Sequence, residues 1–392
     1  MTLFPFFQHR REHGRFRQLP EKLKQIIFYA EDRSSWPHYE SLIRELTDTR
    51  GHDICYLTSS AADPILSSDN PHIHAFNIGA SSVRTSVFLG VEAKVMIMTM
   101  PDLDTFYIKR SKEAKVHYVY LFHSIVSTHM IYRRRAFDHY DTVFCVGPHH
   151  VNEIRSAERV FALPPKNLVD HGYNRLETII AERPHEGPAV VNDGGYTVLV
   201  APSWGDEGVL EQLAQPLTKT LLDSGFNVII RPHPMTIKRH PKILDELRVS
   251  FGGDRRFKLE VDISDVWSLH KSHVMISDWS GAALEYAFGL ERPVLFLDMP
   301  RKVNNQDYWK LDIEPLEVWV RGEIGKVVAP DSLEQVPDTI AKLCADPSGF
   351  KQKVAKIRDR SIFNLGRSGQ VAADHIERIL DVDQHPIRRP PA

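Results

Sequence analysis

The chain has 392 residues, which is enough for two α/β domains of ordinary size. Its hydrophobic content is 42%, its charged content is 26% and its formal net charge is -2, so no global positive field points to nucleic acid as a partner. No run of about 18 apolar residues occurs, and the three cysteines are scattered, which predicts neither a transmembrane helix nor a disulfide or zinc framework. We expect a cytoplasmic protein.

The amino-terminal stretch MTLFPFFQHRREHGRFRQLP does not read as a signal peptide, because its apolar part is short and precedes the basic residues. We favour its interpretation as a frayed polar terminus. The alternative is a peripheral contact with the inner face of the cell membrane, made by Phe4, Phe6 and Phe7 beside the arginines.

Apolar runs typical of strands alternate with helical patterns through the first half of the chain, which is the signature of an α/β fold with a mainly parallel sheet. Residues 183–195 (RPHEGPAVVNDGG) are rich in Pro and Gly and have no period, so we interpret them as a linker after a first domain, 1–182. The predicted strands of this domain are 25–29, 53–58, 72–78, 94–100, 117–122 and 142–146, with an amphipathic helix at 39–47.

The same alternation restarts after the linker and predicts a second domain, 196–392. Two Rossmann-like domains of similar size are expected to face a cleft, with ligands beyond the carboxyl ends of the strands. The predicted strands are 197–201, 227–230, 257–261, 274–276 and 294–297. The predicted helices are 209–222, 241–249, 263–270, 282–290, 333–344, 351–358 and 370–380.

The most informative segment is VMISDWSGAALEYAFGLERPVLFLD, residues 274–298, which reads as strand, polar turn, helix and strand. The turn contains Ser277, Asp278, Ser280 and Gly281. Free backbone N–H groups and the positive end of the helix meet there, so the turn favours an anion, and a nucleotide diphosphate is the natural ligand. No GxxxxGK[ST], GxSxG or HExxH pattern is present.

Two further strand ends carry polar residues suited to phosphate. Arg231 and His233 lie in the rigid turn IIRPHP, where a guanidinium fork and an imidazole can both donate to phosphate oxygens. Ser203 in APSWG can contact a phosphate, and Trp204 is either a pocket wall or core. Glu285, one turn beyond Gly281, is either a ribose ligand or a solvated helix carboxylate.

The first domain offers a candidate base. His123 follows the strand 117–122 and can accept a proton from a hydroxyl group, although a structural histidine is the alternative; His129 is a weaker candidate. The densest basic stretch surrounds it and includes Arg133, Arg134 and Arg135. We interpret this stretch as the side that binds a polyanionic acceptor or an anionic membrane, with a solvated basic surface as the alternative.

These motifs, taken together, make the second half similar to the CDP-glycerol glycerophosphotransferase family of teichoic acid polymerases and primases. Five segments match in order: HGYNRLE, LVAPSWGDEG, IIRPHP, MISDWSGAALEYAFGLERPVLFLD and FNLGRSGQVAADHIERIL. The resemblance covers residues 171–380 well and implies a GT-B-like fold. It also implies that Arg231, His233, Ser277, Ser280 and Gly281 hold donor phosphates and that His123 is the base. The sequence departs from the family pattern at Ser124, where the family has Gly, and at Asn174, where it has Pro.

The resemblance implies transfer of a polyol phosphate from a CDP-linked donor to a hydroxyl acceptor, a polyol phosphate or glycan that can be lipid-linked. The product would be a cell-surface polymer such as teichoic acid or capsule, made without a metal or other cofactor. Two alternatives remain at this point. One is a nucleotide-sugar-dependent GT-B glycosyltransferase of polysaccharide biosynthesis, and the other is a non-catalytic nucleotide-sugar-binding scaffold.

Overall fold

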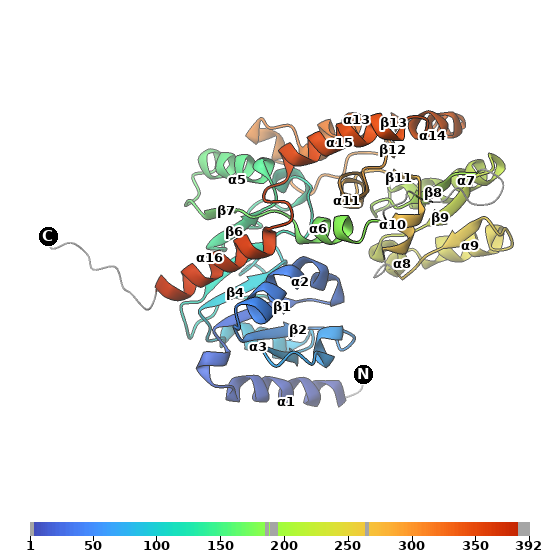
Figure 1. Cartoon of the computed structure of the whole chain (residues 1–392). Helices are drawn as coiled ribbons and strands as arrows, with labels where there is room; N and C mark the ends of the chain where they lie inside the picture. Colours follow the sequence, from blue (N-terminus) through green and yellow to red (C-terminus); the bar gives the residue numbers. More distant parts are fainter. Residues whose placement is uncertain (1–3, 185–187, 189–194, 263–265, 383–392) are drawn as a thin grey trace.

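The computed structural model describes residues 4–184, 188, 195–262 and 266–382, which form two parallel β-sheets with helices packed on them (Figure 1). The first sheet has the strand order β3-β2-β1-β4-β5-β6-β7 and the second has β10-β9-β8-β11-β12-β13. All pairs are parallel. The predicted α/β architecture of two Rossmann-like domains is therefore confirmed.

Apart from β7 and β13, the strands occupy the positions that the apolar runs predict, within one or two residues at each end. In the first sheet they are β1 Ile26–Ala30, β2 Ile54–Thr58, β3 Ile73–Asn77, β4 Val95–Met98, β5 His117–Leu121, β6 Thr142–Cys145 and β7 Asn167–Asp170. In the second sheet they are β8 Thr197–Val200, β9 Asn227–Ile230, β10 Phe257–Leu259, β11 Val274–Ser277, β12 Val294–Leu297 and β13 Gly325–Val328.

The sequence analysis missed β7 and β13. Both are edge strands, and both expose polar residues, so neither has the continuous apolar run of a central strand. Edge strands pair on one side only, which leaves their sequences less constrained by burial.

The helices of the first half are α1 Phe4–Gln18, α2 Trp36–Arg44, α3 Ser82–Leu89, α4 Thr128–Ile131, α5 Pro148–Val160 and α6 Asn174–Ala181. Those of the second half are α7 Val209–Asp223, α8 Pro234–Arg239, α9 Pro241–Phe251, α10 Trp267–Lys271, α11 Gly281–Leu290, α12 Leu316–Trp319, α13 Arg321–Ile324, α14 Val336–Cys344, α15 Pro347–Ser361 and α16 Ser368–Val382. Most of the predicted linker, residues 185–187 and 189–194, lies outside the described residues, as do residues 263–265 of one predicted helix.

The expectation of a frayed amino terminus is wrong for residues 4–18. They form α1, which packs against β3 and α3 at the edge of the first sheet (Figure 1). Phe16 is 3% exposed and meets the ring of Phe76 edge to face, whereas Phe7 is 62% exposed. In the part of the chain that the structure describes, no helix is long and apolar enough to cross a membrane.

The last helix corrects the predicted domain assignment. We expected α16 in the second domain, but it packs on the first sheet beside α2 (Figure 1). Its residues Ala372, Ala373 and Ile376 join the core formed by β1, β2 and α2. The apolar face of an amphipathic helix does not specify which sheet it covers, so the sequence alone could not assign α16.

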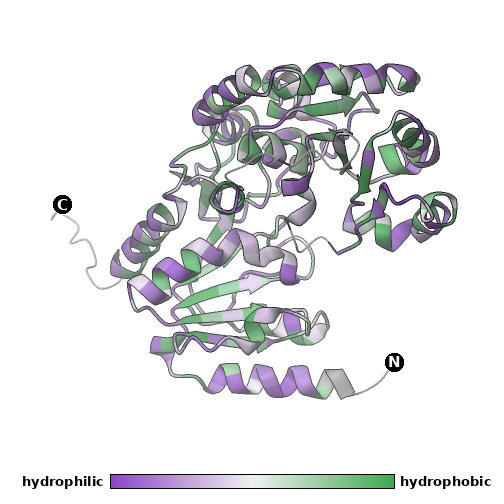
Figure 2. Ribbon diagram, turned by 45° about the vertical axis from the view of Figure 1, so that its right-hand side comes forward, coloured by the Kyte–Doolittle hydropathy of each residue, from purple (hydrophilic) through white to green (hydrophobic). Residues whose placement is uncertain are grey.

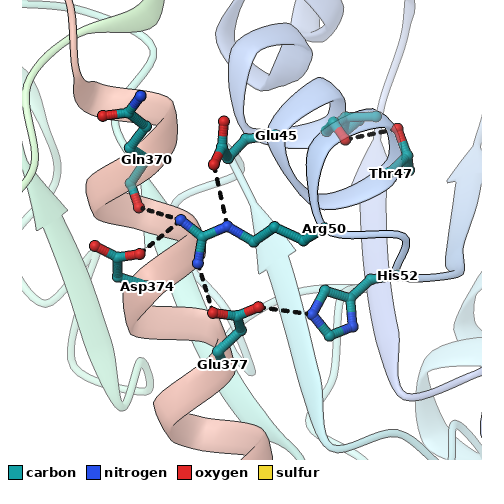
Figure 3. A network of polar contacts seen from close by, with 8 residues as sticks. Glu45, Thr47, Arg50, His52, Gln370, Asp374 and Glu377 are labelled. Atoms are coloured by element: carbon teal, nitrogen blue, oxygen red, sulfur yellow. Dashed lines mark hydrogen bonds and ion pairs between the residues drawn. The ribbon is translucent and has the colours of Figure 1, made fainter.

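A polar network fastens α16 to the first domain (Figure 3). Arg50, just after α2, donates to Glu45 on its own segment and to Asp374 and Glu377 on α16. His52 contacts the second oxygen of Glu377 at 2.9 Å. The chain therefore begins and ends its described part on the first domain.

One cluster of buried apolar residues contains residues of both sheets, and each sheet has a further cluster of its own on its other face. The strands are mostly hydrophobic and the helices turn hydrophilic faces outward (Figure 2). Helix α11 lies within the cluster that both sheets share because it is apolar on every side, and all its residues from Ala283 to Leu290 are buried. α11 packs closely on α6 at Gly289, where an added Cβ atom would lie 2.5 Å from a side-chain methyl of Ile179. The two halves of the molecule thus meet along α6 and α11.

Candidate active site

The second sheet reverses its strand order between β8 and β11, and ligands of such sheets bind beyond the carboxyl ends of the strands at this point. Helix α11 begins there. Ser280 is its N-cap, and the Ser280 Oγ accepts a hydrogen bond from the backbone N of Ala282 at 3.3 Å. The positive end of a ten-residue helix therefore lies where the sequence predicts an anion site.

Three predicted phosphate ligands bind to neighbouring protein groups instead. The buried hydroxyl of Ser277 donates to the carbonyl of Ala201 at 2.9 Å. The Asp278 carboxylate, 2% exposed, accepts from the backbone N and the hydroxyl of Ser203 at 2.6 and 3.0 Å. These contacts hold the three side chains in place in the described structure, and their predicted contact with a phosphate stays a prediction. They join the loops that follow β8 and β11.

Arg231 at the end of β9 is also held by its own domain. Its Nη1 donates to Glu260 at 3.2 Å and to the hydroxyl of Ser268 at 2.7 Å. Burial lowers the pKa of Arg231, and the carboxylate of Glu260 acts in the opposite direction. Its guanidinium lies at the predicted edge of the sheet, and its contact with a phosphate stays a prediction.

His233 is the N-cap of α8, and its Nδ1 accepts a hydrogen bond from the backbone N of Met235 at 3.1 Å. This bond places the proton of the neutral ring on Nε2. Burial, together with the charge of Lys302, lowers the pKa of His233 to about 4. His233 is thus a neutral N–H donor at the carboxyl edge of the sheet.

Trp204 is partly exposed and so does not belong to the core, whereas its role as a pocket wall stays a prediction. Its partly exposed ring lies 6.1 Å from the ring of His233, between the ammonium of Lys302 at 4.3 Å and the guanidinium of Arg239 at 4.9 Å. Lys302 also donates to the carbonyl of Trp204 at 3.1 Å. An aromatic face flanked by two cations suits an anionic, planar ligand.

His123 lies just beyond β5 in the first domain, where its Nδ1 is 3.3 Å from the hydroxyl of Tyr120. Burial lowers the pKa of His123, although a hydrogen bond to the Thr99 backbone and the charge of Glu285 act to raise it. The ring is therefore neutral at pH 7, which is the state a general base requires.

The loop that carries His123 touches the start of α11. Gly281 has so little space that a Cβ atom on it would lie 2.6 Å from the Oγ of Ser124. The absence of a side chain at Gly281 therefore allows the close approach of Ser124 from the first domain, and its predicted contact with a phosphate stays a prediction. This contact brings the candidate base and the predicted anion-binding end of α11 together from opposite domains.

Glu285, one turn into α11, links the same two domains. Its Oε1 accepts from the hydroxyl of Tyr173 at 2.7 Å, and its Oε2 accepts from the Nε of Arg175 at 2.8 Å. It is 8% exposed, so the interpretation as a solvated helix carboxylate is wrong. Its predicted contact with ribose stays a prediction.

Three side chains near His123 were missed by the sequence analysis: Tyr173, Arg175 and His38. The first two belong to HGYNRLE, a segment that we noted only for its resemblance. His38 is 8% exposed, and its ring lies 6.1 Å from that of His123 and 5.7 Å from that of Tyr173. Burial, and then the neighbouring His123 and Arg175, hold the pKa of His38 well below 6.5. No sequence pattern singles it out.

Two buried carboxylates brace the loop after His123. Glu317 of α12 accepts from the backbone N and hydroxyl of Ser127 at 2.8 and 2.7 Å, and Glu153 of α5 accepts from those of Thr128 at 2.6 and 2.7 Å. Burial acts to lower the pKa of His129, but its hydrogen bond and charge interaction with Glu153 raise it. His129 thus supports the loop, which makes it a poor base.

The basic residues Arg133, Arg134 and Arg135 border a cavity of about 240 Å³, which Asn305 and Leu311 of the second half also line. Arg134 donates to Asp307 at 3.1 Å, and Arg135 to Asp138 at 2.8 Å, while Arg133 lies over an aromatic ring. Of the described residues that line this cavity, none is His123 or a predicted donor-binding residue. The basic stretch therefore borders a space separate from the start of α11.

Searches by sequence gave no match to a protein-family model or to a curated protein. The fold, however, is similar to solved GT-B structures. The wall teichoic acid polymerase TagF with CDPG aligns at a TM-score of 0.60 and 15% identity, over 98% of this chain and 96% of TagF. The UDP-GlcNAc 2-epimerase of Neisseria meningitidis bound to UDP-GlcNAc aligns at a TM-score of 0.61 and 13% identity, over 91% of this chain and 100% of the epimerase. S. aureus MnaA with UDP aligns at a TM-score of 0.59 and 14% identity, over 94% of this chain and 99% of MnaA. The chain thus has the GT-B fold.

Proposed function

We propose that this protein is a transferase that moves a polyol-phosphate group, such as glycerophosphate, from a CDP-linked donor to a hydroxyl acceptor in cell-surface polymer biosynthesis. The observation that supports this best is the contact between Ser124 and Gly281, which brings His123 to the start of α11. A base and an anion-binding helix end are the two groups that such a transfer needs. The shared fold with TagF, solved with CDPG, agrees with the proposal.

The donor's diphosphate would lie at the carboxyl edge of the second sheet. The positive end of α11, the hydroxyl of Ser280 and the Nε2 proton of His233 would stabilise its oxygens. Arg231 adds positive charge at the same edge. Trp204 and Lys302 border the position next to His233, where the nucleotide can extend.

The reaction requires a group that accepts a proton and the cleavage of one phosphorus–oxygen bond. Neutral His123 accepts the proton of the acceptor hydroxyl, and the oxygen forms a bond to the phosphorus that carries the polyol. The bond from this phosphorus to the bridging oxygen breaks, and CMP leaves with the electron pair. The donors around α11 stabilise the charge that develops on the CMP phosphate. His123 then releases its proton to solvent.

The acceptor would approach from the first domain. Its basic stretch, Arg133 to Arg135, keeps the role that we predicted for it, contact with a polyanionic acceptor. The exposed arginines of α1, such as Arg10 and Arg11, would provide a peripheral contact with an anionic membrane when the acceptor is lipid-linked.

The test has a binding arm and a turnover arm. A thermal-shift panel of CDP-glycerol, CDP-ribitol, UDP-sugars and GDP-sugars should show selective stabilisation by a CDP-linked polyol. The variant His123→Ala should keep this shift but lose CMP release with acceptor present. Selective stabilisation by UDP-sugars would overturn the assignment of the donor.

A nucleotide-sugar-dependent glycosyltransferase is the second candidate. It is favoured by the similar alignment of two proteins solved with UDP-GlcNAc or UDP. Such an enzyme would use the same donor site but transfer a sugar instead of a polyol phosphate. The thermal-shift panel of donors therefore distinguishes the two candidate functions. Donor binding without turnover on any acceptor, in wild type and variant alike, would favour a non-catalytic scaffold.

A further inference from the structure

Arg175 in the first turn of α6 presents an anchored guanidinium group. Its Nε donates to Glu285 at 2.8 Å, and its side chain is 23% exposed. A guanidinium has five N–H donors, four of them on Nη1 and Nη2. Within the described part of the chain, no hydrogen bond of these two nitrogens to a protein group is found. The Nε of Arg175 is thus held by Glu285, while Nη1 and Nη2 remain available to a ligand.

Arg175 lies between the candidate base His123 and the predicted phosphate ligands at the start of α11. Its anchor Glu285 is on α11, one turn from the helix start, and also bonds Tyr173, whose hydroxyl is 3.0 Å from the carbonyl of His123. The charge of Arg175 acts on Arg231 and on His38, lowering the pKa of both. The guanidinium is therefore close to the groups that surround the proposed reaction.

Arg175 is better prepared for phosphate than Arg231. The Nη1 of Arg231 already donates to Glu260 and Ser268, and the residue is 8% exposed. Arg175 holds its carboxylate partner through Nε instead, which leaves the Nη pair in the geometry that binds two oxygens of one phosphate. Little rotational freedom remains to be lost on binding, because Glu285 fixes the plane of the group.

We propose that Arg175 binds the phosphate oxygens of a nucleoside diphosphate through its Nη groups, and that Glu285 is the residue that positions it. The inference rests on the proposed function, since it assigns a new ligand to the same donor site. It also changes the predicted role of Glu285 from ribose ligand to support for Arg175.

The test is calorimetric binding of CDP and of cytidine to the full-length chain. Arg175→Gln should weaken CDP binding by about 10- to 100-fold and leave cytidine binding unchanged, because only the diphosphate meets the guanidinium. Arg175→Lys should also bind CDP more weakly than wild type, because lysine has neither the Nε anchor nor the fork.

Arg183→Gln is the matched control. Arg183 follows α6 and pairs with Glu291 at 2.8 Å, at the far end of α11, so the variant removes the same charge and a similar ion pair. It should bind CDP like wild type. If Glu285 acts through Arg175, adding Glu285→Gln to Arg175→Gln should cause no further loss of CDP affinity.

The outcomes separate the two proposals. If wild type binds neither CDP nor another nucleoside diphosphate, the proposed function fails. If wild type binds CDP and both Arg175 variants bind it equally well, only the role of Arg175 is overturned. Should Arg175→Gln not fold, as judged by its melting curve, Arg175→Lys decides the question.

Discussion

The hydroxyl of Tyr173 donates to Glu285 at 2.7 Å and lies 3.0 Å from the backbone carbonyl of His123. The buried side chain of Tyr173 therefore connects the loop of the candidate base with α11, which begins at the proposed anion site. The connection runs between segments that are 50 and 112 residues away from Tyr173 in sequence.

Tyr173→Phe removes this connection and keeps the ring. We expect a loss of about 1–3 kcal/mol in the free energy of unfolding, because a buried carboxylate loses a donor. We also expect kcat to fall about tenfold or more, because the base is less well placed. Urea denaturation and CMP release measure the two effects. Tyr286→Phe removes a buried hydroxyl of α11 that bonds Ser272 after α10; it should destabilise the fold and leave kcat unchanged.

Gly281→Ala places a methyl group 2.6 Å from the Oγ of Ser124. We expect a loss of no more than about 1 kcal/mol, because the Ser124 hydroxyl can rotate to another staggered position; it would be measured as a lower melting temperature and a weaker thermal shift by the donor. In the Ser124→Ala background the nearest Ser124 atom is the Cβ at 3.8 Å, an ordinary contact. The double variant should therefore recover most of the loss. Equal losses with and without Ser124→Ala would contradict this account of the contact.

The activity should depend on pH through His123. Burial lowers its pKa below 6.5, and the base works in its neutral form, so kcat/KM should be constant near pH 7 and fall as the pH drops through a midpoint below 6.5. Glu285→Gln removes a charge that raises this pKa, so the midpoint should move to lower pH. A pH–rate profile checks both. An acid limb centred above 6.5 would argue against His123 as the base.

Arg50→Ala should loosen α16 from the first domain, because Arg50 contacts Glu45, Asp374 and Glu377 together (Figure 3). We expect a loss of about 1 kcal/mol, since the group is a partly exposed network and not an isolated pair. Hydrogen exchange should rise over residues 368–382 and stay unchanged in the second sheet. Lys219→Ala, which breaks an exposed ion pair on α7, is the control and should change neither region.

Local pattern was enough to predict most of the architecture. Thirteen parallel strands are described, and all but β7 and β13 coincide with apolar runs in the sequence, because a strand buried on both faces must be apolar along its length. The start of α11 was equally predictable. Its N-cap Ser280 and the apolar residues that follow are neighbours in the chain, so the signal is contained in one segment.

The site depends on contacts between distant segments, and these only the tertiary structure decided. A serine or aspartate at a strand end has the same sequence signal whether it faces a ligand or, as Ser277 and Asp278 do, a neighbouring loop. Likewise, α16 shows an apolar face but not the sheet that receives it. The sequence by itself determined the strands, the helix start and the candidate base. The fold decided which side chains meet, because side-chain direction and domain docking are set by packing between residues far apart in the chain.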